Sequence, residues 1–169
     1  MTSVIYEIND EAHIIQSAEL IRISFETVAR DLKLTKDNCP SHTSFITEKQ
    51  LFESHDKGLW FFGLFVNNNQ SGFVAVEKGN TTTYYMEKLA VLPAVRHQGY
   101  GEKLVHFVAD FAARQGAIKL SIGTIHEHVI LKEWYKKLGF TETGLKKFAH
   151  LPFTVCFMEK DLRVSKKTL

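Results

Sequence analysis

The sequence predicts an α/β domain in which helices pack against a mixed sheet. Some segments place an apolar residue at every third or fourth position, which is typical of one buried helix face. Other segments are rich in β-branched and aromatic residues and are bounded by turn-forming residues, which is typical of strands. No Gly-, Ser- or Pro-rich linker and no repeat interrupts the 169 residues, so a single domain over residues 1–169 is expected.

The N-terminal part is expected to form one strand and two helices. Ser3–Ile8 has the composition of a strand, and Asp10 can cap the helix that follows it. The apolar face of that helix, with alternating spacings of four and three, consists of Ile14, Ala18, Ile21, Phe25, Val28 and Leu32. After a polar loop over residues 33–44, a short helix is expected over Thr47–Ser54.

Three strands are expected in the middle of the chain. Leu59–Val66 and Gly72–Lys78 are strand-like and flank a cluster of turn residues, Asn67–Ser71, which predicts a β-hairpin. A second turn, at residues 79–80, leads into a third strand over Thr82–Val91, which ends before Pro93.

The C-terminal half predicts a helix, a strand, a second helix and two closing strands. The first helix begins within residues 96–101, and Gly116 is well placed to end it. Its buried face is expected to hold Leu104, Phe107, Val108 and Phe111. A strand over Ala117–Ile125 and a helix over Val129–Leu138 follow. The closing strands, expected to be antiparallel, are Phe140–Thr143 and Phe153–Leu162.

The composition argues against several classes of protein. The net charge of +2 is too small to favour a nucleic-acid partner, and the basic run Arg163–Lys167 is interpreted as part of a solvated tail over residues 163–169. Two cysteines, Cys39 and Cys156, do not make a disulfide framework, which favours a reducing, cytoplasmic environment. The N-terminus lacks the pattern of a secretory signal, and no segment reaches the roughly 20 apolar residues of a membrane span.

The segment Arg96–Gly101 is the strongest functional signal, because it joins a strand to the start of a helix. Helix N-termini carry unpaired N–H groups and the positive end of a dipole, so they attract anions. Gly99 and Gly101 would let a phosphate approach the backbone, and Arg96 would add a positive charge at the mouth. A tight turn without a ligand is the alternative. Neither of the two familiar glycine-rich phosphate motifs, G-x-G-x-x-G and G-x-x-x-x-G-K-[ST], is present.

A wider pattern resembles the GNAT superfamily of acetyl-CoA-dependent N-acetyltransferases. Its central motif, Q/R-x-x-G-x-G/A, is matched by Arg96, Gly99 and Gly101, which follow the strand segment Glu87–Pro93. A second block, Trp134–Phe140 (WYKKLGF), is similar to the family's LYEKLGF segment. The order of elements from Ile5 to Leu162 also fits.

The resemblance implies a GNAT-like fold with a mixed, mostly antiparallel central sheet flanked by helices, and acetyl-CoA as co-substrate. It implies that the sheet opens beside residues 89–91, where the pantetheine arm pairs with the backbone of Leu89 and Val91. The pyrophosphate would bind the loop and the first helical amides. The implied cofactor-binding set is Leu89, Ala90, Val91, Arg96, His97, Gln98, Gly99, Tyr100, Gly101, Glu102, His128 and Tyr135.

The family reaction is a direct attack of an amine on the thioester, which needs a base, an oxyanion donor and a donor for the leaving thiolate. By resemblance, Tyr135 would serve the thiolate and the N–H of Leu89 the oxyanion. Glu87 is the candidate base, since strand alternation would put it on the face of Leu89. A partly exposed strand carboxylate, with no dedicated base in the reaction, is the alternative. His126 and His128 are rival bases at the rim of the sheet, or simply solvated loop residues.

Three residues depart from the family pattern. His128 replaces the usual Asn, Leu131 the usual Ala and Trp134 the usual Leu, which changes the expected shape of the pantetheine channel. His128 can still donate a hydrogen bond to the cofactor.

The loop Cys39–His42 brings a cysteine and a histidine close together in the sequence, as in many metal sites. It offers two ligands where structural zinc needs four, so no metal is expected. Cys39 is not expected to carry the acyl group, because the family transfers it directly. His42 and Phe45 either line the acceptor pocket or belong to an ordinary surface loop.

The sequence therefore predicts an enzyme, an N-acetyltransferase that acts on a primary amine of a small molecule or peptide. A non-catalytic acyl-CoA-binding or regulatory domain of the same fold is the alternative, and a longer acyl donor is another. The acceptor cannot be identified from the sequence. Homodimers are common among relatives, but no residue pattern here identifies an interface.

Overall fold

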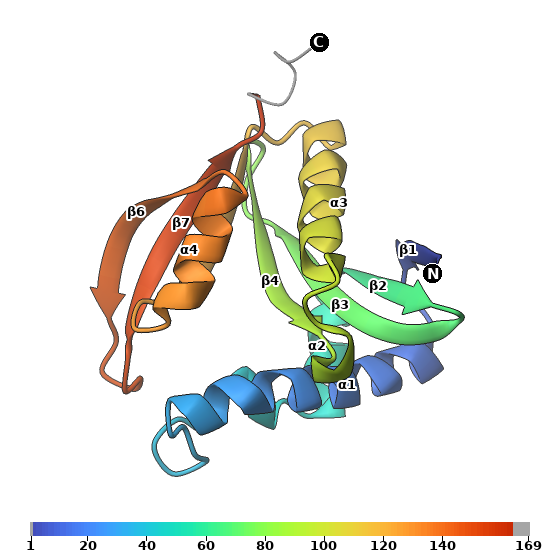
Figure 1. Ribbon diagram of the computed structural model, residues 1–169. Coiled ribbons are helices and arrows are strands. Elements are labelled where there is room, and N and C mark those ends of the chain that lie inside the picture. Colours follow the sequence, from blue (N-terminus) through green and yellow to red (C-terminus); the bar gives the residue numbers. More distant parts are fainter. Residues whose placement is uncertain (1, 164–169) are drawn as a thin grey trace. The chain divides into compact units, whose positions relative to one another are not determined.

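The computed structural model describes residues 2–163 and confirms the predicted α/β class with a mixed sheet. The strands are β1 (Ser3–Glu7), β2 (Trp60–Val66), β3 (Asn69–Lys78), β4 (Thr83–Val91), β5 (Lys119–Ile125), β6 (Phe140–Lys147) and β7 (Thr154–Asp161). The helices are α1 (Glu11–Asp31), α2 (Glu48–Asp56), α3 (Tyr100–Arg114) and α4 (Val129–Lys137), with 3-10 turns η1 (Thr43–Phe45) and η2 (Pro93–Val95). Figure 1 labels these helices and strands.

The strands are hydrogen-bonded in the order β1-β2-β3-β4-β5-β7-β6. The pairs β1–β2, β2–β3, β5–β7 and β6–β7 are antiparallel, and β4–β5 is parallel. The chain forms two compact units. Unit 1 holds the chain up to Glu77 and Lys88–Phe107, and unit 2 holds Lys78–Glu87 and the chain from Val108 onward. Strand β4 therefore begins in unit 2 and ends in unit 1.

The core of unit 1 forms between α1 and the hairpin β2–β3. Helix α1 begins where predicted, since the carboxylate of Asp10 accepts the N–H of His13 at 3.1 Å. Its apolar side packs with residues of strands, of α2 and of loops into one cluster: Ile8, Ile14, Ala18, Leu20, Ile21, Ile46, Leu51, Phe61, Phe65, Phe73, Ala75 and Ala90. Gly63 makes room for this packing, because a Cβ there would lie 2.7 Å from the Ile8 side chain and 2.8 Å from the Phe65 ring.

The turn of the hairpin is shorter than the sequence predicted. Only Asn67 and Asn68 form it, both with positive φ (49° and 67°), and β3 begins at Asn69. Asn tolerates the left-handed region that a two-residue hairpin turn requires. The predicted longer turn, Asn67–Ser71, was wrong because Gln70 and Ser71 are polar but buried in the strand. The amide of Gln70 donates to the Ser17 hydroxyl at 2.8 Å.

Unit 2 contains β5, β6, β7 and α4 (orange to red in Figure 1). The predicted antiparallel closing strands are confirmed, but β6 runs on to Lys147 instead of ending at Thr143. The extension was missed because residues 141–147 are all exposed, so they carry no apolar alternation. Helix α4 ends at Lys137, with Leu138 as its C-cap, and the next residue is Gly139, whose φ of 96° is readily adopted by glycine. The predicted basic tail lies outside the described residues, except for Arg163.

We expect Ile21→Ala to lower the free energy of unfolding by about 2–5 kcal/mol, as is usual for deleting most of a buried side chain. Ile21 is fully buried in α1, whereas Ile23 on the same helix is 43% exposed. The matched variant Ile23→Ala should change it by no more than about 0.5 kcal/mol. Equal losses in urea unfolding would show that the core is misassigned.

Candidate functional site

The loop between β4 and α3 has the geometry of an anion site. His97 and Gly99 have positive φ, 62° and 83°, so the chain turns sharply before the helix begins at Tyr100. The first helical hydrogen bond runs from the Lys103 N–H to the Gly99 carbonyl at 3.0 Å. The amides that precede Lys103 in the first turn therefore have no acceptor within the helix. A Cβ at Gly99 would meet nothing within 4 Å, so the loop is open at this point.

The side chain of Arg96 differs from the prediction. Its three nitrogens donate to the Val91 carbonyl (3.1 Å), the Thr27 hydroxyl (3.0 Å) and the Ser24 carbonyl (2.7 Å). The guanidinium is half-buried, and this burial lowers its pKa. Its charge thus points into unit 1 and not toward the mouth of the loop. The hydrogen bonds of the guanidinium connect the loop to β4 and α1. The guanidinium also uses the carbonyl of Val91, a residue whose backbone was predicted to pair with pantetheine.

Strand β4 is irregular beside the loop. Lys88, between Glu87 and Leu89, has a φ of 55°, a conformation outside the strand region. The regular alternation that placed Glu87 on the face of Leu89 therefore does not apply across Lys88. All three residues are half-buried. Glu87 remains a predicted base without this geometric support.

Tyr135 is buried in α4 of unit 2. Its ring makes edge contacts with Trp134 (5.0 Å between centroids) and Phe140 (5.4 Å). Burial raises the pKa of the phenol well above its ordinary value, so the group stays protonated. Within residues 2–163 no group makes a hydrogen bond with its hydroxyl. The hydroxyl is therefore free to donate.

His128 is the N-cap of α4, a role that the sequence analysis missed. Its Nδ1 accepts the N–H of Leu131 at 3.2 Å. The proton of a neutral ring must then sit on Nε2, so only Nε2–H remains to meet a ligand. The family resemblance could have indicated this capping role, because the Asn that is usual at this position is itself a good N-cap.

His126, the other predicted rival base, belongs to a polar cluster in unit 2. Its Nδ1 lies 2.8 Å from Nζ of Lys132, and that nitrogen lies 3.6 Å from Oε1 of Glu142. Cys156 donates its thiol proton to the same oxygen at 3.2 Å. Donor atoms of His126, Glu142 and Cys156 all lie within 4.8 Å of one another, a set able to ligate a metal. Two of these donors, on His126 and Glu142, contact the Lys132 ammonium.

The charges of this cluster shift two pKa values in opposite directions. Hydrogen bonds from Lys136 (2.9 Å) and Cys156 lower the pKa of Glu142 to about 2. Burial and the bond to Glu142 raise the pKa of Cys156 to about 11, so its side chain is a thiol at neutral pH.

In the loop after α1, the rings of His42 and Phe45 make an edge contact at 6.2 Å between centroids, and the His42 N–H donates to the Cys39 carbonyl at 3.1 Å. Cys39 is fully buried, and this burial raises the pKa of its thiol, which does not suit a nucleophile. His42 is buried, its pKa is lowered by burial, and its Nδ1 accepts the N–H of Ser44 at 3.3 Å.

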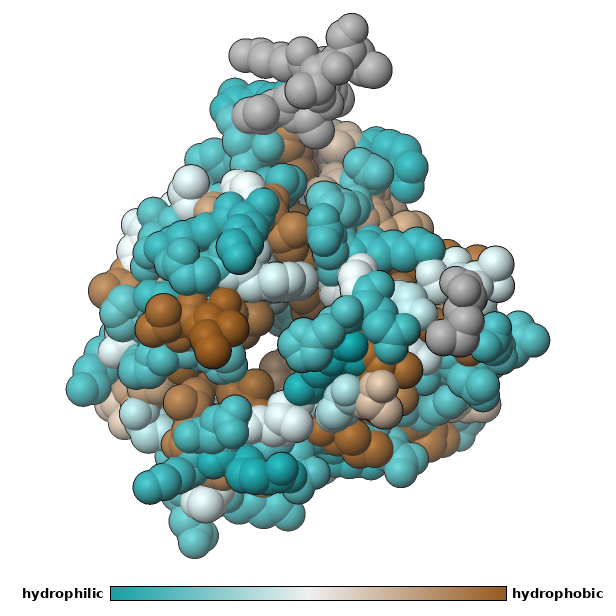
Figure 2. Space-filling model, viewed as in Figure 1, coloured by the Kyte–Doolittle hydropathy of each residue, from teal (hydrophilic) through white to brown (hydrophobic). Residues whose placement is uncertain are grey.

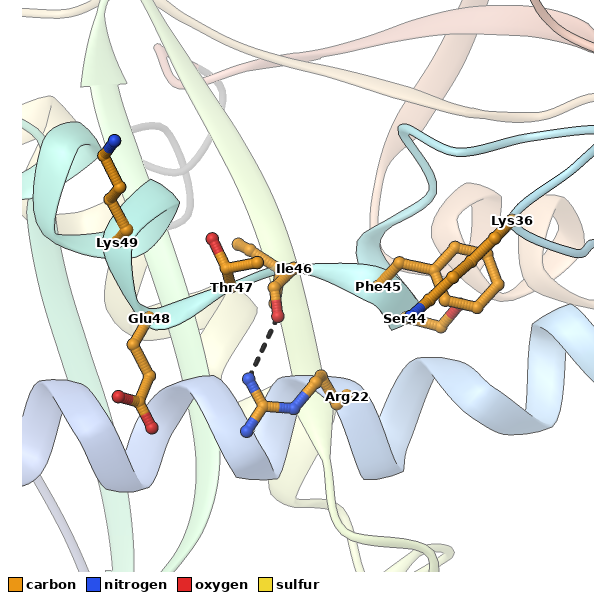
Figure 3. A pocket seen from close by; sticks show the side chains of 8 residues that line it. All are labelled: Arg22, Lys36, Ser44, Phe45, Ile46, Thr47, Glu48 and Lys49. Carbon is orange, nitrogen blue, oxygen red and sulfur yellow. Dashed lines mark hydrogen bonds between the residues drawn. The ribbon is translucent and has the colours of Figure 1, made fainter.

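Phe45 lies at the wall of an open depression of about 550 Å³, where the other lining residues are Arg22, Lys36, Ser44, Ile46, Thr47, Glu48 and Lys49 (Figure 3). Arg22 donates to the Ile46 carbonyl at 3.0 Å. It projects from a different side of α1 than Ser24 and Thr27, so this depression is separate from the anion loop.

The comparisons with known proteins agree with this fold. Residues 25–140, more than half of the chain, match the family model described as "Acetyltransferase (GNAT) family". The chain therefore belongs to the GNAT acetyltransferase family. No curated protein sequence matches it.

Solved structures with the same fold are similar to it at low sequence identity. The PaiA N-acetyltransferase of Thermoplasma acidophilum, in complex with coenzyme A, has a TM-score of 0.77 and 15% identity, covering 95% of this chain and 99% of that one. The ribosomal-protein-S18-alanine N-acetyltransferase of Escherichia coli has a TM-score of 0.76 and 14% identity, covering 95% and 94%. A GNAT family acetyltransferase of Elizabethkingia anophelis with acetyl-CoA bound has a TM-score of 0.71 and 17% identity, covering 94% and 97%. Over residues 2–163, no helix is both long and apolar enough to cross a membrane.

We expect Arg96→Gln to lower the free energy of unfolding by about 1.5–3 kcal/mol, the range for hydrogen bonds of charged groups. Arg30→Gln is the matched control on α1, because Arg30 makes one exposed ion pair with Glu26 at 3.5 Å. It should cost less than about 1 kcal/mol. If denaturant unfolding gave equal midpoints for the two variants, the structural role of Arg96 would be refuted.

We expect Glu142→Gln to make the protein less sensitive to acid. Because folding lowers the pKa of Glu142 from 4.5 to about 2, its stabilising effect is complete above pH 4.5 and is lost as the pH falls toward 2. The variant should therefore be less stable than the wild type at pH 7, and the difference should shrink between pH 4.5 and 2. Thermal unfolding across this range measures it. A difference that stays constant with pH would assign the effect to packing.

Proposed function

We propose that this protein is an acetyl-CoA-dependent N-acetyltransferase that transfers an acetyl group to a primary amine in a ternary complex. The observation that carries the proposal is the loop Arg96–Gly101, which presents unpaired helix amides in a chain of the GNAT family. Solved structures of the same fold contain acetyl-CoA or coenzyme A, which supports the choice of co-substrate.

The proposed cofactor contacts in unit 1 are made by backbone groups. The pyrophosphate would accept hydrogen bonds from the amides of residues 97–102, with the negative charge next to the helix dipole. Arg96 would act on this site indirectly, by holding the loop. Leu89 would supply its backbone to the pantetheine arm, and its N–H to the oxyanion.

In the proposed reaction the amine nitrogen attacks the thioester carbon and the carbon–sulfur bond breaks. The amine loses one proton in total, and the released thiolate gains one. Tyr135 would stabilise the sulfur by donating a hydrogen bond. Complete transfer of its proton is uphill, because the phenol pKa is raised while a thiol has a pKa of about 8.5. The proton that ends on sulfur would therefore come from the amine, through Glu87 or solvent.

The acceptor class is left to experiment. Solved structures of this fold include an aminoglycoside 6'-N-acetyltransferase of Enterococcus faecium and the ribosomal-protein-S18-alanine enzyme, whose acceptors differ widely. An amine is therefore the proposed acceptor class, with no particular molecule named.

The test combines calorimetry of acetyl-CoA binding with a free-thiol release assay over a panel of amines. Binding should be lost in Gly99→Glu, which puts a negative charge at the loop, and weakened less in Gly99→Gln, which adds similar bulk without charge. Thiol release with one amine class would establish the enzyme and identify the acceptor. Binding without release would favour the alternative, a non-catalytic acyl-CoA-binding domain. Equal binding by Gly99→Glu and the wild type would refute the assigned phosphate loop.

We expect Tyr135→Phe to lower kcat by about 10²-fold, the scale of one lost proton or hydrogen-bond donor. The dissociation constant of acetyl-CoA should change less than three-fold, because the ring and its packing are kept. Trp134→Phe is the control for a changed aromatic neighbour. Unchanged turnover in Tyr135→Phe would remove the phenol from the mechanism.

A further inference from the structure

Helix α4 is held on unit 2 by very few buried side chains. It has nine residues, and only Lys132 and Tyr135 are buried, each 7% exposed. They are three positions apart and therefore share one face of the helix. A buried lysine is unusual on such a face, because the charge must be paired there to offset the loss of water.

The Lys132 ammonium meets groups from two other parts of unit 2. It lies 2.8 Å from His126 Nδ1, just after β5, and 3.6 Å from Glu142 Oε1 on β6. Glu142 in turn accepts the Cys156 thiol of β7. One cation on α4 thus contacts β6 and the residue after β5 directly, and is linked to β7 through Glu142, and these contacts oppose sliding or rotation of the helix.

Lys136 is a natural contrast to Lys132. It also contacts Glu142, at 2.9 Å, but its side chain is 39% exposed and it pairs with Glu133 on the same helix as well. A surface ion pair of this kind contributes little to positioning, since water and salt screen it.

We propose that Lys132 is a positioning residue, whose buried ammonium fixes α4 on the sheet of unit 2 and so sets the place of the Tyr135 hydroxyl. The inference rests on the proposed function of Tyr135 for its effect on turnover, but not for its effect on structure. It also changes the role of His126. Nδ1 of His126 accepts from the ammonium, so this nitrogen serves the positioning network instead of taking a proton from the substrate.

The experiment compares Lys132→Met, Lys136→Met and Lys132→Arg in two separate measurements. The first is structural: the NMR signals of the Tyr135 ring, assigned by comparison with Tyr135→Phe. They should shift in Lys132→Met, stay in place in Lys136→Met and return toward the wild type in Lys132→Arg. Unmoved ring signals in folded Lys132→Met would overturn the proposal. This measurement holds whether or not the protein is an enzyme.

The second measurement is kinetic and uses a double-mutant cycle with Tyr135→Phe. Lys132→Met should lower kcat at least ten-fold while the dissociation constant of acetyl-CoA stays within two-fold, and this loss should vanish in the Tyr135→Phe background. Additive losses would mean that Lys132 does not act through Tyr135. Full activity of Tyr135→Phe alone would refute the proposed role of the phenol and leave the NMR result to decide the positioning. If Lys132→Met does not fold, His126→Leu removes the acceptor at 2.8 Å, and a smaller ring shift is expected.

Discussion

The candidate phosphate site depends on the hydrogen bonds made by the guanidinium of Arg96. A loop whose amides bind a ligand cannot also use these amides for internal hydrogen bonds, so other groups must hold the loop in place. In unit 1 this is done by one side chain, whose nitrogens reach a strand carbonyl, a helix carbonyl and a helix hydroxyl. A charged donor suits the task because its bonds are strong and it does not compete for the amides of the loop.

Unit 2 also uses a cationic side chain to hold an element in place. There a buried ammonium, Lys132, is surrounded by a histidine nitrogen and a carboxylate and links one short helix to the sheet. The sequence predicted that Arg96 would meet a ligand. In the structure both cations make their contacts within the protein. A charge removed from water is costly unless it is hydrogen-bonded, so both groups favour the geometry that supplies their partners.

The fold could be predicted to the level of elements because its signals are local. The cap at Asp10, the helical spacing of Ile14, Ala18 and Ile21, and the glycine at position 139 each act within a few residues. The failures have a common cause. Gln70 and the exposed residues of β6 take their conformation from pairing with a neighbouring strand, which the periodicity of apolar residues does not report.

The candidate site was predictable in its backbone and less so in its side chains. The positive φ of Gly99 is one that glycine adopts readily, whereas the positive φ of Lys88 and His97 is uncommon for their residue types and is not expected from the sequence. Likewise, a helix start predicts free amides at residues 97–102. It cannot predict that Arg96 bends back to Ser24, 72 positions earlier in the chain. The spacing of a motif identifies the residues that are important for a site. It leaves open whether each residue contacts the ligand or holds in place another residue that does.

The raised pKa of Tyr135 also constrains the proposed mechanism. A phenol whose pKa is raised above that of a thiol is a poor source of the proton that ends on coenzyme A. In the proposed mechanism the amine therefore supplies that proton, and only the neutral amine attacks. Between neutral pH and the amine pKa, the rate would then rise with the fraction of neutral amine, with no falling limb from the phenol in that range. A protein base such as Glu87 would be needed only to the extent that the amine arrives protonated.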